Sequence, residues 1–299
     1  MTNRALVLGG GGPVGIAWEA GLLAGLVKGG VAVTDADFIL GTSAGSFVGS
    51  QLAMGRSPQA LFEAILAEGE RARPAERQAP SGRKTESPPD LSFLMRKMAE
   101  TRAGERDPAA VRREIGAWAL QAKTMDEAAF IRSFGRGLAS ASDRVWPSAG
   151  FACTAVDALT GEFIVWTFRS NAPLPEAVAS SCSVPGVFPP VTIHGRRYID
   201  GGMRSGTNAD FAKGYARVLV VAVALGGEGE MGRATTAQLD EEVASLRDGG
   251  ARVEVIRPNS ECLSAFGPNL MDPRRRPAAA GAGVKQGEAL APTLRLFLS

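Results

Sequence analysis

The sequence predicts an α/β fold in which a central, mostly parallel sheet is flanked by helices, because one pattern occurs twice near its start. A short apolar strand over residues 5–8 precedes a glycine-rich loop and a helix, and the same order begins again at residues 38–40. Strands that alternate with helices are typical of a parallel sheet. Continuous apolar runs such as these suit strands that are buried on both faces.

The boundary residues define the first elements. Glycines 9–12 end the first strand, and apolar residues at helical spacing then continue to the glycine pair 29–30. The second strand leads through the turn 41–45 into a helix over residues 46–54. Ser57-Pro58 is a typical helix start, so another helix follows.

Residues 70–90 interrupt this alternation. They hold five basic residues, four acidic residues and four prolines, and no apolar residue larger than alanine. A segment of this composition buries too little surface to order itself, so we expect a mobile excursion. Helices resume over residues 91–140, where Asp107-Pro108 starts one helix and a capping box of Thr124 with Glu127 starts the next.

The second half of the chain adds further strands. They are expected at 151–156, 162–168, 191–193, 197–199, 218–225 and 253–256. The first four form two hairpins, with turns at 157–161 and 194–196. From Pro273 onward the sequence predicts a surface helix or loop.

Composition excludes several classes of protein. The net charge is +2, from 33 basic and 31 acidic residues, so no strong field draws the chain to nucleic acid. The apolar run 5–8 is shorter than the roughly 7–15 residues of a signal peptide, and no window approaches the about 20 residues of a membrane span. Cys153, Cys182 and Cys262 are an odd, scattered set, which fits a reducing compartment. We therefore expect a cytoplasmic protein, at most peripheral to a membrane.

Residues 41–45, G-T-S-A-G, match G-x-S-x-G between a strand and a helix. In that context a sharp turn strains the backbone of Ser43 and exposes its Oγ. The next amide, of Ala44, then points toward the position where an oxyanion develops, at a helix N-terminus. A turn of small residues without catalytic function is the alternative.

Residues 9–15 form a second glycine-rich turn between a strand and a helix, and two functions compete for it. As G-x-G-x-x-G it would bind a pyrophosphate, whereas as a row of exposed amides it would stabilise the oxyanion of an acyl-transfer intermediate. A dinucleotide site needs an acidic residue at the end of the next strand, but Asp35 and Asp37 precede that strand. The neighbouring serine turn also favours the oxyanion hole. A turn without a ligand is the third interpretation.

A serine nucleophile needs a base, and the chain has one histidine, His194. It lies in a hairpin turn, which favours an exposed side chain directed away from Ser43. Asp200 is the better candidate, because it ends a strand and precedes two glycines that let it approach another loop closely. An aspartate has an unperturbed pKa near 3.9, so its action as a base depends on positioning and desolvation.

Together these motifs resemble the patatin-like phospholipase family. The glycine loop 9–15, the G-x-S-x-G turn and the D-G-G at 200–202 occur in the family's order. Residues 179–190 resemble its A-S-x-x-x-P-x-x-F-x-P segment, and the hairpin 191–200 matches the one that leads into its catalytic aspartate.

The resemblance implies a three-layer α/β/α fold, a single patatin-like domain over residues 1–299. Within it we expect the mobile excursion at 70–90 and a lid-like helical region at 91–140. The expected substrate is a lipid or fatty-acyl ester, with peripheral membrane contact and no nucleic acid. Apart from the resemblance, the basic tract 274–276 would either contact anionic lipid or form a solvated loop.

The resemblance also implies a mechanism, which is a Ser–Asp dyad that needs no histidine. Ser43 would be the nucleophile and Asp200 the base, and the amides of Gly10, Gly11 and Gly12 would hold the oxyanion. The expected activity is hydrolysis of lipid acyl esters, of the phospholipase A type, through an acyl-Ser43 intermediate. No metal or organic cofactor is implied.

One position departs from the family pattern. The family usually has Arg or Lys after the glycines, whereas this chain has Val14. The backbone donors remain, but loss of the cation would lower activity or change the preferred acyl group. Acyl transfer by the same dyad and a non-catalytic lipid-binding protein are therefore kept as alternatives, and a nucleotide-binding module ranks last.

Overall fold

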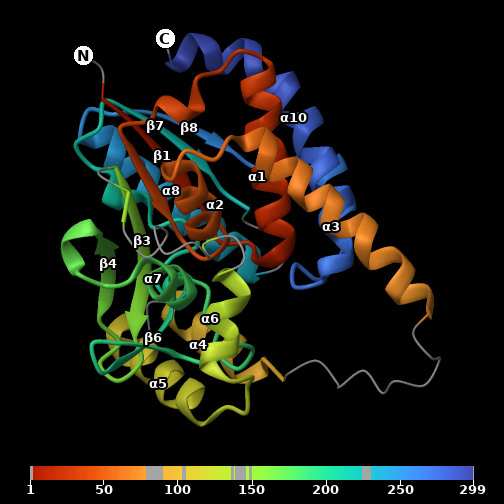
Figure 1. Ribbon diagram of the computed structural model, residues 1–299. Coiled ribbons are helices and arrows are strands. Elements are labelled where there is room, and N and C mark those ends of the chain that lie inside the picture. The colour runs from red at the N-terminus through yellow and green to blue at the C-terminus, as the bar shows by residue number, and fades with distance from the viewer. Residues whose placement is uncertain are drawn as a thin grey trace.

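The strands form one mostly parallel sheet, as predicted. The computed structural model describes residues 3–78, 90–102, 106–135, 138, 146–147, 150–223 and 230–298. Over these residues the strands are β1 (Arg4–Leu8), β2 (Phe38–Gly41), β3 (Phe151–Asp157), β4 (Phe163–Thr167), β5 (Val191–Ile193), β6 (Arg196–Asp200), β7 (Arg217–Val221) and β8 (Arg252–Ile256). They lie in the order β5-β6-β3-β2-β1-β7-β8, with β4 paired to β3 (Figure 1). β4, β5 and β6 are the antiparallel members.

Helices cover both faces of this sheet, which gives three layers (Figure 1). The helices are α1 (Gly12–Lys28), α2 (Ala44–Ala53), α3 (Pro58–Gln78), α4 (Ser92–Arg102), α5 (Pro108–Gln121), α6 (Glu127–Gly135), α7 (Leu174–Ser181), α8 (Glu230–Asp248), α9 (Ser260–Phe266) and α10 (Arg276–Leu298). α1, α2, α3 and α10 pack on one face, and α8 packs on the other. Successive side chains of β1 point to opposite faces of the sheet. Leu6 and Leu8 pack in the cluster with α1, whereas Ala5 and Val7 pack in the cluster with α8.

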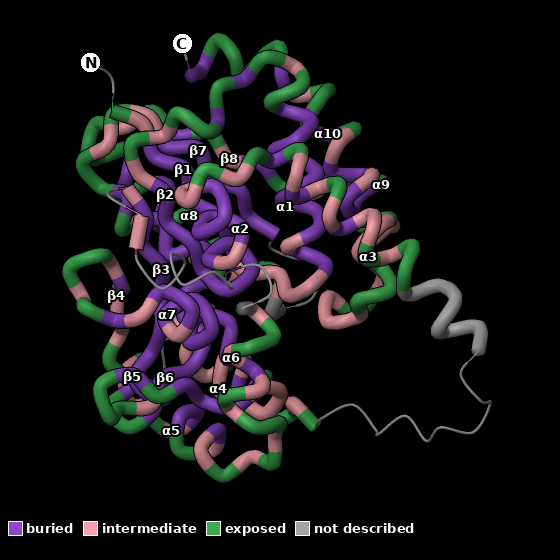
Figure 2. Tube along the Cα trace, viewed as in Figure 1, coloured by how far each residue is buried: buried purple, intermediate pink, exposed green. Residues whose placement is uncertain are grey.

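A further apolar cluster joins the helices after residue 90 to one end of the sheet. Leu94 of α4 and Ile115 of α5 pack with Val156 of β3 and Ile199 of β6. Figure 2 shows that burial follows the strands and the inner helix faces through this region as well. The end of the sheet that carries β6 is therefore part of the packed core.

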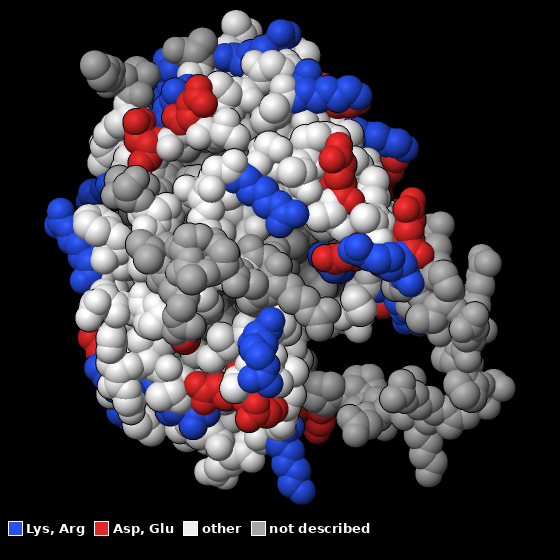
Figure 3. Space-filling model, viewed as in Figure 1, with Lys and Arg blue, Asp and Glu red and all other residues white. Residues whose placement is uncertain are grey.

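The surface carries charges of both signs. On the face drawn in Figure 3, basic and acidic side chains are interspersed. Within the basic tract 274–276, Arg274 pairs with Asp272 at 2.8 Å and Arg276 pairs with Glu68 at 2.6 Å. Each helix within the described ranges is too short or too polar to cross a bilayer.

Two details of the region after α2 differ from the prediction. α3 continues to Gln78, into the segment that we expected to be irregular, while residues 79–89 lie outside the described residues. The predicted capping box at α6 is replaced by Asp126, whose Oδ1 accepts from the amide of Ala129. Glu127 instead binds the amide and hydroxyl of Thr192, which ties α6 to β5.

The C-terminal segment forms the outer helix α10, in line with the predicted surface helix or loop after Pro273, but one face of it is buried. α10 packs along α1 at a seam of small residues, the α1–α10 seam, formed by Gly21, Gly25, Gly283 and Gly287. A Cβ at Gly25 would overlap the carbonyl oxygen of Val284, so the two backbones are in direct contact. The buried face was not predicted because the contact with α1 is made mainly by glycine and alanine rather than by a stripe of large apolar residues.

Candidate active site

β2 and β6 meet along one edge of β3. β2 pairs with residues 151–153 of β3 and β6 with residues 155–157, while β4 pairs with 152–156. A strand has two edges, so β2 and β6 must share the edge opposite β4. β2 is parallel to β3 and ends at Gly41, whereas β6 is antiparallel and ends at Asp200. The two chain ends therefore run toward each other, which brings the turn 41–45 close to Asp200.

Ser43 occupies the sharp turn that the sequence predicts. Its φ of 52° and ψ of −115° are a strained conformation for a residue with a Cβ, of the kind that costs about 1–3 kcal/mol. The two glycines of the motif make the turn possible. A Cβ at Gly45 would overlap the carbonyl of Leu8, and a Cβ at Gly41 would overlap the backbone of Ser46.

The Ser43 side chain lies beside the Asp200 carboxyl group, close enough to favour its ionised form. Asp200 accepts from the amide of Gly202, with 2.7 Å between N and Oδ1. Both side chains are buried, with 7% of Ser43 and 2% of Asp200 exposed. Burial raises the pKa of Asp200 to about 7, although the Gly202 amide and the neighbouring Ser43 side chain favour the ionised form. Asp200 is thus a carboxyl group that exchanges its proton near neutral pH.

The residues that end α7 hold Ser43 and Asp200 from one side. Ser181 Oγ accepts from the Ser43 amide at 3.0 Å, and the Cys182 thiol donates to the Ser43 carbonyl at 3.1 Å. One residue further, the carbonyl of Ser183 accepts from the Asp200 amide at 3.0 Å. Residues 181–183, within the segment 179–190, therefore position both Ser43 and Asp200. The resemblance singled out this segment, but the sequence offered no physical signal for these contacts.

The glycine loop lies beside Ser43 but differs from the prediction at one residue. The amide of Gly10 donates to the carbonyl of Gly206 at 2.8 Å, so this predicted donor is already engaged. Among the described residues, the amides of Gly11, Gly12 and Ala44 have no acceptor. These three amides, unlike that of Gly10, are therefore not engaged by another group of the described chain.

Val14 and His194 lie outside this arrangement. Val14 is fully buried in the core, and its amide donates to the carbonyl of Leu270 at 3.2 Å. His194 is exposed in the turn before β6, whereas Asp200 ends that strand. β6, from Arg196 to Asp200, lies between them and spans roughly 13 Å. Within the described ranges, no group of three or more His, Cys, Asp or Glu residues is placed to hold a metal ion.

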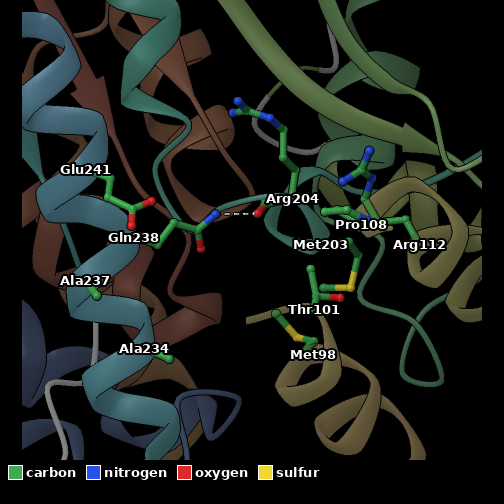
Figure 4. A pocket seen from close by; sticks show the side chains of 10 residues that line it. All are labelled: Met98, Thr101, Pro108, Arg112, Met203, Arg204, Ala234, Ala237, Gln238 and Glu241. Carbon is green, nitrogen blue, oxygen red and sulfur yellow. Dashed lines mark hydrogen bonds between the residues drawn. The ribbon is translucent and has the colours of Figure 1, made fainter. Parts of the chain in front are cut away.

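A separate cavity of about 340 Å³ lies beyond the turn that follows Asp200 (Figure 4). Met203 and Arg204 form part of its wall, and Gln238 of α8 donates to the Arg204 carbonyl across it at 2.8 Å. Neither Ser43 nor Asp200 lines it. This cavity adjoins the loop that carries Asp200 and is distinct from the site around Ser43.

The family model for patatin-like phospholipases matches residues 6–213. The chain belongs to this family. A patatin-like phospholipase is in general a lipid acyl hydrolase, and the matched region contains the glycine loop, Ser43 and Asp200. A search of curated proteins finds no match.

Two solved structures resemble this patatin-like phospholipase. VipD from Legionella pneumophila aligns with a TM-score of 0.49 and 14% identity over 98% of this chain and 67% of its own. The type III effector protein ExoU aligns with a TM-score of 0.42 and 14% identity over 99% of this chain and 53% of its own. The chain thus spans about half to two thirds of the length of these structures.

Proposed function

We propose that the protein hydrolyses acyl esters of lipids, as a phospholipase A-type enzyme, with Ser43 as nucleophile and Asp200 as base. The proximity of the Ser43 hydroxyl to the buried Asp200 carboxylate carries this proposal. The strained turn at Ser43 and the raised pKa of Asp200 support it, because a base with a pKa near 7 is matched to neutral pH.

In the first half-reaction, Asp200 takes the hydroxyl proton while Ser43 Oγ bonds to the ester carbonyl carbon. The carbonyl oxygen becomes an oxyanion that the amides of Gly11, Gly12 and Ala44 bind, and each such donor contributes about 2.7–4 kcal/mol to transition-state binding. When the carbon–oxygen bond to the leaving alcohol breaks, the proton passes from Asp200 to that alcohol. Ser43 is left as an acyl ester.

In the second half-reaction, Asp200 takes a proton from water while the water oxygen attacks the acyl carbon. The bond to Ser43 Oγ breaks, the proton returns to Ser43, and the fatty acid leaves. The chain's own residues supply every proton transfer and every charge contact in these steps.

The test is labelling with a fluorophosphonate probe, followed by intact mass and peptide mapping. We expect one adduct, on Ser43, which is absent in Ser43→Ala and slower by about 10²–10⁴-fold in Asp200→Asn. Ser46→Ala is the matched control, since Ser46 is a buried serine of the same turn whose hydroxyl donates to the Ser43 carbonyl, and it should keep the adduct. A folded wild-type protein that takes no label would refute the proposal. Product analysis with a phospholipid, with and without an acceptor alcohol, then separates hydrolysis from acyl transfer.

A further inference from the structure

Asn208 lies where the parts of the site meet, although none of the motifs includes it. It is fully buried, with φ at 51° in the left-handed region, at the start of the short 3-10 helix η5 (Ala209–Ala212). It follows the loop 201–207, which begins directly after Asp200. Asparagine tolerates this backbone conformation better than most residues, so the backbone alone would explain an asparagine here. The side-chain contacts go beyond that explanation.

The amide nitrogen of Asn208 reaches the residues next to both Ser43 and Asp200. Nδ2 lies 3.1 Å from Thr42 Oγ1 and 3.3 Å from the carbonyl oxygen of Gly201. It also lies 2.9 Å from the Ser205 carbonyl oxygen and 3.5 Å from Thr154 Oγ1 on β3. Thr42 precedes Ser43 and Gly201 follows Asp200, so one donor group links the two chain ends that meet along β3.

The contacts of Asn208 also determine which way its amide faces. Oδ1 accepts from Arg204 Nη1 at 2.9 Å, and the same guanidinium pairs with Asp210 at 2.7 Å. Nδ2, with two hydrogens, therefore faces the four oxygen atoms. An aspartate would fit the space but would present an acceptor to those oxygens.

The same loop also supports the glycine loop. The carbonyl of Gly206 accepts from the Gly10 amide, and Thr207 binds Glu242 of α8 at 2.6 Å. Glu242 in turn accepts from the amide of Ala209 at 2.8 Å. The segment 205–209 is therefore anchored to α8 on one side and contacts the nucleophile turn, the Asp200 turn and the glycine loop on the other.

We propose that Asn208 is a positioning residue that holds the Ser43 turn and the Asp200 turn in register for proton transfer. This inference rests on the proposed function of Ser43 and Asp200. Asn208 itself touches neither the substrate nor the transferred proton. Because a displacement of about 1 Å in such a pair can reduce the rate by about 10²-fold, loss of the link should appear in the chemical step.

The experiment compares Asn208→Asp and Asn208→Gly with the same changes at Asn171. Asn171 is an exposed asparagine with φ at 53°, so it matches the backbone of Asn208 without its contacts. Rates of fluorophosphonate labelling are measured per folded molecule, with the folded fraction taken from calorimetry. For the Asn208 variants we expect a loss of about 100-fold in labelling rate and in kcat, with KM within threefold of wild type. The Asn171 variants should label within twofold of wild type.

Folded Asn208 variants that label within threefold of wild type would overturn the inference. If neither variant folds, Thr42→Val decides, because it removes the hydroxyl that Asn208 contacts and leaves the backbone of Asn208 unchanged. A folded Thr42→Val protein with wild-type kinetics would overturn the inference as well, and a slowed one supports it. A wild-type protein without any label would refute the proposed function instead, so the two failures are distinct.

Discussion

Burial of Asp200 would allow the proposed dyad to work near neutral pH without a histidine. An exposed aspartate is ionised but too weak a base, whereas burial raises the pKa of Asp200 to about 7. In the proposed mechanism the ionised form accepts the Ser43 proton. Labelling of Ser43 should therefore rise with pH around a midpoint near 7, and at pH 6 it should be about tenfold slower than on the plateau. A profile that stays flat between pH 5 and 9 would contradict this role for Asp200.

The same burial destabilises the fold when Asp200 is ionised. Its pKa is 3.8 ordinarily and about 7 when folded, so the folded state binds the proton more tightly. Protonated Asp200 therefore contributes to the free energy of unfolding, and this contribution is fully present below pH 3.8. It is lost as the pH rises through 7, by about 4 kcal/mol in all. Asp200→Asn, which stays neutral, should raise the free energy of unfolding at pH 8 by up to about this amount and have little effect near pH 4. Urea unfolding at the two pH values tests this.

The matched control for that measurement is Asp240→Asn. Asp240 is an exposed aspartate, 62% accessible, in a surface pair with Arg257. Its replacement should change the free energy of unfolding by less than about 0.5 kcal/mol at either pH. If both variants respond alike, burial is not the cause.

Sequence reasoning could bring Ser43 and Asp200 together only through motifs. Each stands at a strand end before small residues, and this local pattern is visible in the chain. The contacts of Ser181, Cys182 and Asn208 depend on side chains that are distant in sequence and leave no periodic signal. The bond that engages the Gly10 amide is of the same kind, since its partner, Gly206, belongs to a loop about 200 residues away.

At the scale of elements, the α1–α10 seam makes two glycine substitutions in helices behave in opposite ways. A methyl group at Gly25 would overlap the carbonyl of Val284, whereas at Gly281 it would meet nothing within 4 Å. We expect Gly25→Ala to destabilise the protein by about 1–3 kcal/mol through overpacking. Gly281→Ala should stabilise it by about 0.5–1 kcal/mol, because alanine loses less backbone entropy in a helix. Urea unfolding of the two variants checks both signs, and a stabilised Gly25→Ala would mean that the helices are not in backbone contact.

Elements with large apolar residues were predictable from the sequence, and elements without them were not. β1, β2 and the two hairpins follow from apolar runs and turn residues at their boundaries. The part of α10 from 279 to 291 lacks that signal, since its buried residues are alanine and glycine apart from Gln286. The start of α6 was misplaced because Asp126 caps the helix and Glu127 is used for a contact with β5.

At the scale of the whole molecule, the chain beyond the family match is part of the fold. β7 lies beside β1, and β8 and α8 complete the sheet and its second layer. This region also supports the glycine loop, because the Val221 carbonyl accepts from the Gly9 amide and the Leu270 carbonyl from the Val14 amide. The order of strands in space could not be predicted, since β7 crosses over to pair with β1 from more than 200 residues away.

Truncation tests this dependence. A chain that ends at residue 213 would expose the edge of β1 and the apolar faces of α1 that α10 covers. We expect it to lose the cooperative unfolding transition of the full chain in calorimetry and to take no fluorophosphonate label. A cooperative transition in the shortened chain would show that residues 6–213 fold alone.

The α1–α10 seam also has a mechanical consequence. Where backbone rests on backbone, there are no side-chain rotamers whose change would let one helix slide along the other. The glycine loop leads directly into α1, so the backbone amides of this loop belong to the end of a helix that cannot slide along α10. The helices α4, α5 and α6 instead pack through side chains such as Leu94, Ile115 and Phe130, which can change rotamer. We therefore expect the movement that admits a long acyl chain to occur among these helices, while the amides proposed to bind the oxyanion stay in place.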